Sequence, residues 1–159
     1  MERRFVSVEK GLGPQGRIAV VRLDRGDNIN ALSHQAMREL RDVPRDFEDD
    51  LETSVVILTG SSKAFSAGFD LKDPQSRERE QLSIGERIQR QRLGPRMCRA
   101  WEDMDQVTIA AIEGHCIGGA AALVVALDFR LCGRSAHFRI PEIELGMNMS
   151  GDRSRACWR

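Results

Sequence analysis

The alternation of apolar and polar residues in the first third of the chain predicts a β-hairpin followed by a helix. Apolar residues gather over residues 5–8 and 17–23, and a glycine-rich turn separates them, so two paired strands are expected. Over residues 33–47 apolar side chains recur at helical spacing. Ser33 is the expected N-cap, and Pro44, which has no backbone N–H, is expected to kink or end the helix.

The middle of the chain alternates between apolar runs and charged stretches, which predicts an α/β fold. Residues 54–60 form a continuous apolar run closed by glycine, which is typical of a strand buried on both faces of a parallel sheet. Residues 72–91 carry mixed charges with few apolar anchors and predict a surface loop that passes into a helix. Beyond it the pattern predicts a helix over residues 95–104, a strand over 107–113, a turn over 114–119, a buried helix over 120–127 and a strand over 129–133.

Composition and charge narrow the class of protein. The chain has 159 residues, which at about 150 residues per domain indicates one domain. Lys and Arg together number 24, as do Asp and Glu, so no overall charge steers the protein to nucleic acid or to an anionic membrane. The four cysteines form no C-x-x-C pair and the three histidines lack metal-ligand spacing, so no metal site is expected. The sequence shows neither a signal peptide nor a bilayer-spanning apolar run, and we expect a cytoplasmic protein without membrane insertion.

Two turns rich in small residues follow predicted strands, at residues 62–68 and 114–119. In open α/β sheets ligands bind at the carboxyl ends of the strands, and the second turn also opens a helix, whose first N–H groups have no partner. Two peptide N–H groups converging from such turns would form an oxyanion hole for an acyl carbonyl that becomes an enolate. The alternative is that both turns serve only to pack helices on the sheet.

Four motifs in this chain resemble segments of the crotonase (enoyl-CoA hydratase/isomerase) superfamily. Residues 64–71, A-F-S-A-G-F-D-L, resemble its A-F-x-A-G-x-D-[IL] segment, and residues 113–120, E-G-H-C-I-G-G-A, resemble its second glycine motif. Residues 30–32, N-A-L, and residues 138–146, F-R-I-P-E-I-E-L-G, resemble its early and later segments. The motifs follow the family order over residues 5–149.

The resemblance implies the crotonase-like (Clp/crotonase) α/β fold of repeated ββα units, incomplete here at the C-terminus. It implies an acyl-CoA substrate, with coenzyme A as part of the thioester and no tightly bound cofactor, and a homotrimer or hexamer for the full-length form. It also implies an oxyanion hole made by the N–H groups of Ala67 and Gly119. The positions implied to lie along the coenzyme A channel are Ala31, Leu32, Ala67, Phe69, Asp70, Leu71 and Gly119.

The acid/base residues decide the reaction, and here the chain departs from part of the family. Hydratases that it resembles use two glutamates; the first position falls on Ala122, which has no proton to give, and the second on Glu142. A single carboxylate can more easily shuttle one proton between two carbons, so isomerase-type chemistry is favoured over hydration. The alternatives are a non-catalytic acyl-CoA-binding protein or an inactive truncated member of the family, and a hydratase. The alternative interpretation of Glu142 is a solvated surface residue without a catalytic role, like its neighbour Glu144, because glutamate is mostly found at the surface.

Two other features suggest chemistry that we do not favour. Cys116 beside His115 suggests a thiol nucleophile, but adjacent side chains on a turn point apart and cysteine is commonly a small buried residue. Residues 87–99 contain several arginines and no acidic residue, so they could bind phosphates. We interpret them as a solvated helix face without a nucleic-acid partner, because no aromatic residue is interleaved for base stacking.

The end of the chain does not follow the family pattern. We expect residues 1–149 to form a partial crotonase-fold core domain and residues 150–159 an atypical polar tail. A shift of one base in a coding sequence for W-G-S-L-P-R-L-L-A, a continuation typical of the family, produces residues 151–159. We therefore hypothesise a frameshift or sequencing error after Ser150, which reading the DNA would test. In such a shortened chain we expect the 120–127 helix to lose apolar partners and to expose hydrophobic surface.

Overall fold

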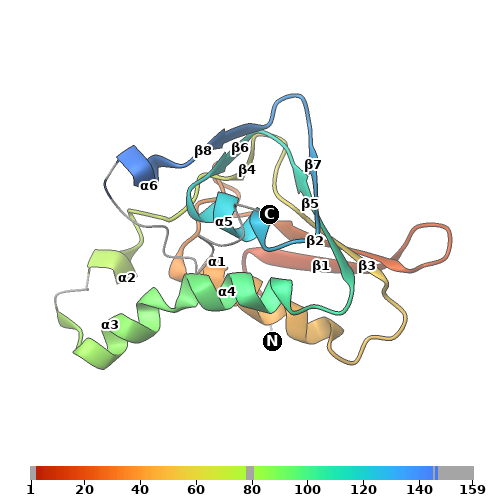
Figure 1. The fold of residues 1–159 in the computed structure, drawn as a ribbon, viewed down its shortest axis with the longest axis horizontal. Helices are drawn as coiled ribbons and strands as arrows, with labels where there is room; N and C mark the ends of the chain where they lie inside the picture. The colour runs from red at the N-terminus through yellow and green to blue at the C-terminus, as the bar shows by residue number, and fades with distance from the viewer. Residues whose placement is uncertain (1–2, 78–80, 145, 147–159) are drawn as a thin grey trace.

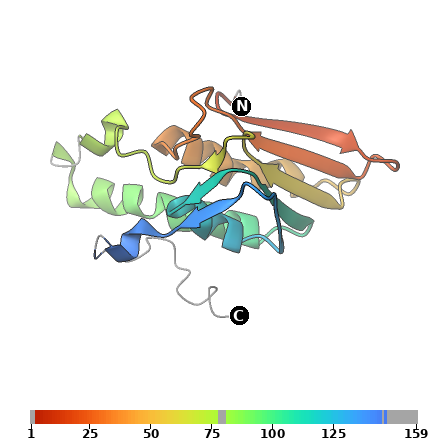
Figure 2. The same ribbon diagram turned by 90° about the horizontal axis from the view of Figure 1, so that it is seen from above.

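The strands form two sheets in the computed structural model, which describes residues 3–77, 81–144 and 146 (Figures 1 and 2). The five-stranded sheet has the order β1 (Val6–Leu12), β2 (Ile18–Leu23), β3 (Val55–Thr59), β5 (Val107–Ile112) and β7 (Phe129–Cys132). The three-stranded sheet has the order β4 (Ala64–Ser66), β6 (His115–Ile117) and β8 (His137–Arg139). The hairpin β1–β2 is antiparallel and the other pairs are parallel.

The helices complete a repeated unit of two strands and a helical segment. They are α1 (His34–Asp42) with the 3-10 turn η1 (Val43–Phe47), α2 (Pro74–Arg77), α3 (Ile84–Gln91), α4 (Leu93–Glu102), α5 (Gly119–Val125) and α6 (Pro141–Glu144). From the second unit onward, the first strand of each unit joins the large sheet and the second joins the small sheet. This confirms the expected α/β fold of ββα units.

The first predicted elements are confirmed, with differences in their bounds: β1 continues to Leu12, and the helix expected over residues 33–47 is divided into α1 and η1. The Ser33 Oγ accepts the Ala36 N–H at 3.2 Å and so caps α1. The α-helix ends at Asp42, just before Pro44, and the chain continues as the 3-10 turn η1. β3 is parallel to both of its neighbours, as expected, but its burial alternates: Val56 and Leu58 are buried, whereas the residues between them are only half-buried. The expectation that both of its faces are fully buried is therefore wrong.

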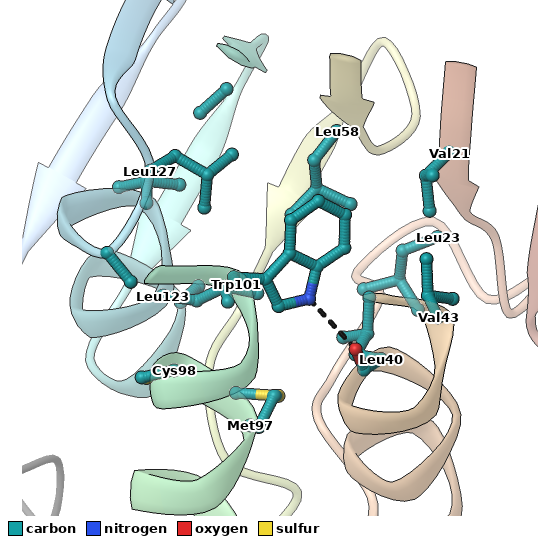
Figure 3. Close-up of a cluster of buried hydrophobic side chains, with 14 of the residues drawn as sticks. Val21, Leu23, Leu40, Val43, Leu58, Met97, Cys98, Trp101, Leu123 and Leu127 are labelled. Atoms are coloured by element: carbon teal, nitrogen blue, oxygen red, sulfur yellow. Dashed lines mark hydrogen bonds between the residues drawn. The ribbon is translucent and has the colours of Figure 1, made fainter. Parts of the chain in front are cut away.

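A buried cluster joins the large sheet to α1, α4 and α5 (Figure 3). In Figure 1, α1 and α4 lie side by side along one face of the sheet. Trp101 of α4 is almost fully buried, and its indole Nε1–H donates to the carbonyl oxygen of Leu40 in α1 at 2.8 Å. A helix would normally satisfy that carbonyl with the N–H four residues later, but that residue is Pro44, which has none. The indole thus replaces the hydrogen bond that proline removes from the helix.

Two expectations about the C-terminal part of the chain have a different outcome. The helix α5 is buried from Ala120 to Val124, so the expected loss of its apolar partners is wrong. Exposed apolar side chains lie instead on β7 and β8, at Phe129, Leu131 and Phe138. The predicted tail, residues 150–159, lies outside the described residues. None of the helices in the described part of the chain has the length and apolar character needed to cross a bilayer.

We predict that Trp101→Phe lowers the free energy of unfolding by about 1–3 kcal/mol, because the ring stays buried while the Leu40 carbonyl loses the donor that stands in for Pro44. Urea unfolding followed by circular dichroism measures the change. Phe138→Leu, at an exposed position on β8, is the control and should shift the free energy by less than about 0.5 kcal/mol. Equal shifts for the two variants would contradict the role of the indole hydrogen bond.

Candidate active site

The two turns singled out from the sequence meet at the small sheet. β4 and β6 are parallel neighbours, so their carboxyl ends lie at the same edge. Gly68, with a φ of +81°, lies so close to the second turn that a Cβ on it would sit 2.4 Å from the carbonyl oxygen of Ile117. The same Cβ position is 3.5 Å from the backbone nitrogen of Gly119. Only glycine permits this contact of main chain with main chain.

Ser66 and Asn30 hold the first turn in place. The Ser66 hydroxyl donates to the carbonyl oxygen of Asn30 at 2.6 Å and accepts the N–H of Gly68 at 3.1 Å. The side-chain amide of Asn30 donates to the carbonyl oxygens of Leu23 and Ala64, at 2.9 and 3.2 Å. Ser66 and Asn30 are fully buried. Sequence analysis placed both residues in motifs but did not predict that they bond to each other, because they are far apart in the chain.

The backbone N–H of Ala67 is not free to bind a ligand oxygen, which departs from the expectation for the oxyanion hole. It donates to the carbonyl oxygen of Ile29 at 2.8 Å. The N–H of Phe69 is placed differently. Leu32 donates to the Gly68 carbonyl at 2.7 Å and accepts from the Asp70 N–H at 3.1 Å, so the N–H of Phe69 between them faces away from Leu32. It has no acceptor among the described residues.

Gly119 is placed as expected for the second main-chain donor. It is the first residue of α5, and a first helical N–H has no intrahelical acceptor. The preceding N–H, that of Gly118, donates to the carbonyl oxygen of Arg139 at 2.9 Å and so ties this turn to the end of β8. The structure therefore brings the N–H of Gly119 and the turn that carries Phe69 together, in place of the expected pair of Gly119 and Ala67.

The carboxylate of Glu142 lies directly against this second turn. A Cβ on Gly118 would sit 2.6 Å from its Oε1, so the missing side chain of this glycine makes room for the carboxylate. The Oε2 atom is buried and has no hydrogen-bond partner among the described residues. A buried carboxylate oxygen without a partner is costly, and such groups are typical of sites that a ligand completes.

Glu144 points away from this site, and Ala122 contributes no carboxylate to it. Glu144, in the same short helix as Glu142, is exposed and pairs with Arg139 at 2.6 Å, so it is the solvated neighbour. The structure thus separates the two glutamates in the way that the P-E motif favoured, with one carboxylate against the turn and the other in solvent. Ala122 lies buried in α5 and offers only a methyl group where the sequence resemblance places a glutamate in hydratases.

The two stretches predicted to line the coenzyme A channel lie side by side. Leu32 and Phe69 form the parallel bridge described above, and Ala31 and Leu32 are buried, so they offer mainly backbone. Phe69 and Leu71 are 44% and 82% exposed and offer side chains. Sequence analysis missed Arg25, whose guanidinium donates to the Ala31 carbonyl at 2.6 Å and to the Asp70 carboxylate at 2.8 Å. Arg25 thereby fixes one stretch against the other.

Cys116 is a buried residue, and part of the arginine-rich stretch lies on an exposed helix. Cys116 is fully buried, and burial raises the pKa of its thiol to about 12, so the nucleophilic thiolate is not available near neutral pH. The helix α3, which carries part of the arginine-rich stretch, buries none of its residues. Within residues 3–77, 81–144 and 146 there is no cluster of three or more histidine, cysteine or acidic residues able to hold a metal ion.

Comparisons with known proteins relate this chain to one family. The chain matches the model of the enoyl-CoA hydratase/isomerase family over residues 13–153. It is 32% identical to the short-chain-enoyl-CoA hydratase of Clostridium acetobutylicum, over 92% of this chain and 53% of the relative. It is 33% identical to the crotonyl-CoA hydratase of Syntrophomonas wolfei, over 86% of this chain and 51% of the relative.

A solved structure supports the fold. The crystal structure of the enoyl-CoA hydratase from Bacillus anthracis matches with a TM-score of 0.81 and 28% identity, over 97% of this chain and 57% of that one. The chain spans about half the length of the curated relatives it matches.

We predict that Gly68→Ala destabilises the protein more than Gly26→Ala does. Both glycines have a positive φ, which costs an alanine about 1–2 kcal/mol, but a Cβ on Gly26 meets nothing within 4 Å. At Gly68 the methyl group collides with the Ile117 carbonyl, and such overpacking adds about 1–3 kcal/mol. Urea unfolding measures both variants, and equal losses would show that the two turns do not meet as described.

Proposed function

Because the chain belongs to the enoyl-CoA hydratase/isomerase family, we propose that it binds an acyl-CoA thioester at the two turns and moves a proton on the acyl chain. Coenzyme A enters as part of the substrate, and the mechanism needs no tightly bound cofactor. One observation carries the proposal: the buried, unpartnered Oε2 of Glu142 lies beside the turn at Gly118. A group that must exchange a proton with a substrate needs a free oxygen in this kind of setting.

The thioester oxygen accepts hydrogen bonds from two main-chain donors in this proposal. Gly119 supplies one N–H, as expected from the sequence, and Phe69 supplies the other, because the N–H of Ala67 is already donated to Ile29. Both donors are fixed before the substrate arrives, so they stabilise the negative charge that develops on the oxygen without reorganisation. Loss of one such donor typically slows an enzyme by about 10²–10³-fold.

Glu142 then serves as the single acid/base group. Its carboxylate takes a proton from C2 of a 3-enoyl thioester, and the electrons of the broken C–H bond move into a dienolate whose charge rests on the thioester oxygen. The same carboxyl returns the proton to C4, and the double bond ends between C2 and C3. One carboxylate suffices because a proton leaves and returns with no other reactant involved.

Hydration and simple binding are the competing functions. The relatives quoted above are named hydratases, which favours hydration, but Ala122 leaves this site with one carboxylate where adding water calls for two proton-handling groups. A non-catalytic acyl-CoA-binding protein would keep the main-chain donors and lose turnover. We favour isomerisation because the Glu142 carboxylate is present and unpartnered.

We retain three further expectations as proposals. Ala31, Leu32, Phe69, Asp70 and Leu71 would contact coenzyme A, largely through backbone groups. The full-length form would assemble as a trimer or hexamer, and the exposed apolar side chains of β7 and β8 are a surface that such an assembly would cover. We also retain the cytoplasmic location.

We predict that Glu142→Gln lowers turnover of a 3-enoyl-CoA by about 10²–10⁴-fold while the Kd for a saturated acyl-CoA changes little, because the amide fills the same space but cannot take the proton. Fixed-time activity assays give the turnover rate, and isothermal titration calorimetry gives the Kd. Glu144→Gln, on the exposed side of the same helix, is the matched control and should keep the wild-type rate. Unchanged turnover in Glu142→Gln would remove this residue from the mechanism.

We predict that a panel of 3-enoyl, 2-enoyl and aromatic CoA thioesters shows conversion of the 3-enoyl compound without hydration of the 2-enoyl compound. The physical reason is the methyl group of Ala122 where a second carboxylate would be needed. Chromatography of the products measures both reactions. Hydration at a rate comparable to isomerisation would favour the hydratase, and tight binding without any product would favour the non-catalytic protein.

A further inference from the structure

A buried histidine–aspartate pair lies next to the candidate active site, and the mechanism above does not use it. The Asp73 Oδ2 accepts the backbone N–H of His34 at 2.7 Å and the His34 Nδ1 at 3.0 Å. The side chains of His34 and Asp73 are 6% and 7% exposed. Because a carboxylate only accepts, the imidazole carries its proton on Nδ1. The second oxygen of Asp73 accepts the N–H of Gln75 at 2.9 Å, at the start of α2.

Two sets of contacts, which we call clamps, join residues 32–34 to residues 69–73, and the His34–Asp73 pair forms the second of them. Leu32 and Phe69 form the first clamp, through the main-chain bonds on either side of Phe69. His34 and Asp73 lie a few residues further along each segment and form the second. Residues 69–73, which include the expected coenzyme A contacts Phe69, Asp70 and Leu71 and which we call the channel wall, are therefore fixed at both ends, and each end is held to the start of α1.

The Phe69 side chain packs against the ring of His34. Its ring and that of His34 meet edge-on, with centroids 5.7 Å apart and an interplanar angle of 78°. Phe69 is 44% exposed, so one part of its ring contacts the buried imidazole while another part faces the surface. The imidazole in turn cannot rotate without breaking its bond to Asp73. This chain of contacts fixes the orientation of an aromatic side chain that would otherwise be free to move.

We propose that His34 and Asp73 are positioning residues that hold residues 69–73 and the Phe69 ring in the arrangement that receives an acyl-CoA. The proposal rests on the proposed function, because it assigns that wall to the ligand. The pair acts on binding and not on proton transfer. The Phe69 N–H is held separately by the Leu32 clamp, and Glu142 belongs to a different unit of the fold.

The ionisation of Asp73 supports this assignment. Burial by itself raises the pKa of the carboxyl, but the hydrogen bonds from the His34 and Gln75 N–H groups and from the imidazole outweigh it, so the pKa lies below its ordinary value. The pair therefore holds a carboxylate at neutral pH, and a hydrogen bond to a charged acceptor is stronger than one between neutral groups.

The test compares binding with turnover in Asp73→Ala and in two variants of His34. We expect Asp73→Ala to raise the Kd for butyryl-CoA by about tenfold, with kcat on a 3-enoyl-CoA within about twofold of wild type, because only the wall is released. His34→Asn keeps an N–H donor for Asp73 and should recover part of the affinity that His34→Ala loses. His137→Asn, an exposed histidine on β8, is the matched control and should bind as wild type does.

A second readout tests the clamp without any ligand. Hydrogen exchange in Asp73→Ala should speed up at the N–H groups of His34 and Gln75, while the Asp70 N–H in the Leu32 clamp keeps its protection. Should Asp73→Ala fail to fold, Asp73→Asn replaces it: its amide keeps one acceptor oxygen instead of two, so exchange should speed up at one of the two N–H groups, His34 or Gln75, and the Kd should rise less than in Asp73→Ala.

Each outcome has a distinct meaning. A wild-type Kd in a folded Asp73→Ala overturns the positioning role and leaves the proposed function standing. An equal loss of kcat and affinity also overturns it, since the pair would then act on the reacting groups or on the whole fold. If the wild-type protein binds no acyl-CoA, the proposed function itself is wrong and the positioning role falls with it.

Discussion

The structure depends on the approach of main chain to main chain between two turns. Gly68 meets the carbonyl of Ile117 at a distance that no Cβ permits, and Gly114 lies equally close to the backbone at Lys63. These contacts are possible because β4 and β6 pair directly and no side chain separates the segments that follow and precede them. Beside them lie the N–H groups of Phe69 and Gly119, which have no acceptor among the described residues and are the donors that we propose for the thioester oxygen.

The large elements could be predicted from the sequence, whereas the small sheet could not. Hydrophobic periodicity identified β1, β2, β3, β5, α1, α4 and α5, because each buries enough side chains to leave a repeating pattern. β4, β6 and β8 have three residues each, too few for a period, and they exist because neighbouring strands satisfy their backbone groups. The motifs therefore located both turns, but the sequence pattern did not predict the small sheet that aligns them.

One of the two expected main-chain donors moves by two residues, from Ala67 to Phe69, and the reason is local. Which N–H points toward a ligand depends on the direction of each peptide, and Gly68, with its positive φ, changes that direction between Ala67 and Phe69. A motif names the residues of a turn but not the partners of their N–H groups. Glu142 and Glu144 differ in the same respect: the motif singled out Glu142, but packing against Gly118 is what buries its carboxylate and leaves that of Glu144 in solvent.

Each ββα unit supplies a different part of the candidate site. The start of α1 and residues 69–73 come from the first two units, the N–H of Gly119 from the third and Glu142 from the fourth. The placement of the carboxylate relative to the oxyanion donors rests on the pairing of β6 with β8 and on the hydrogen bond from the Gly118 N–H to the Arg139 carbonyl. In the proposed mechanism, a change that loosens β8 would therefore impair proton transfer before it impairs binding, because the proposed coenzyme A channel lies on the units that β8 does not hold.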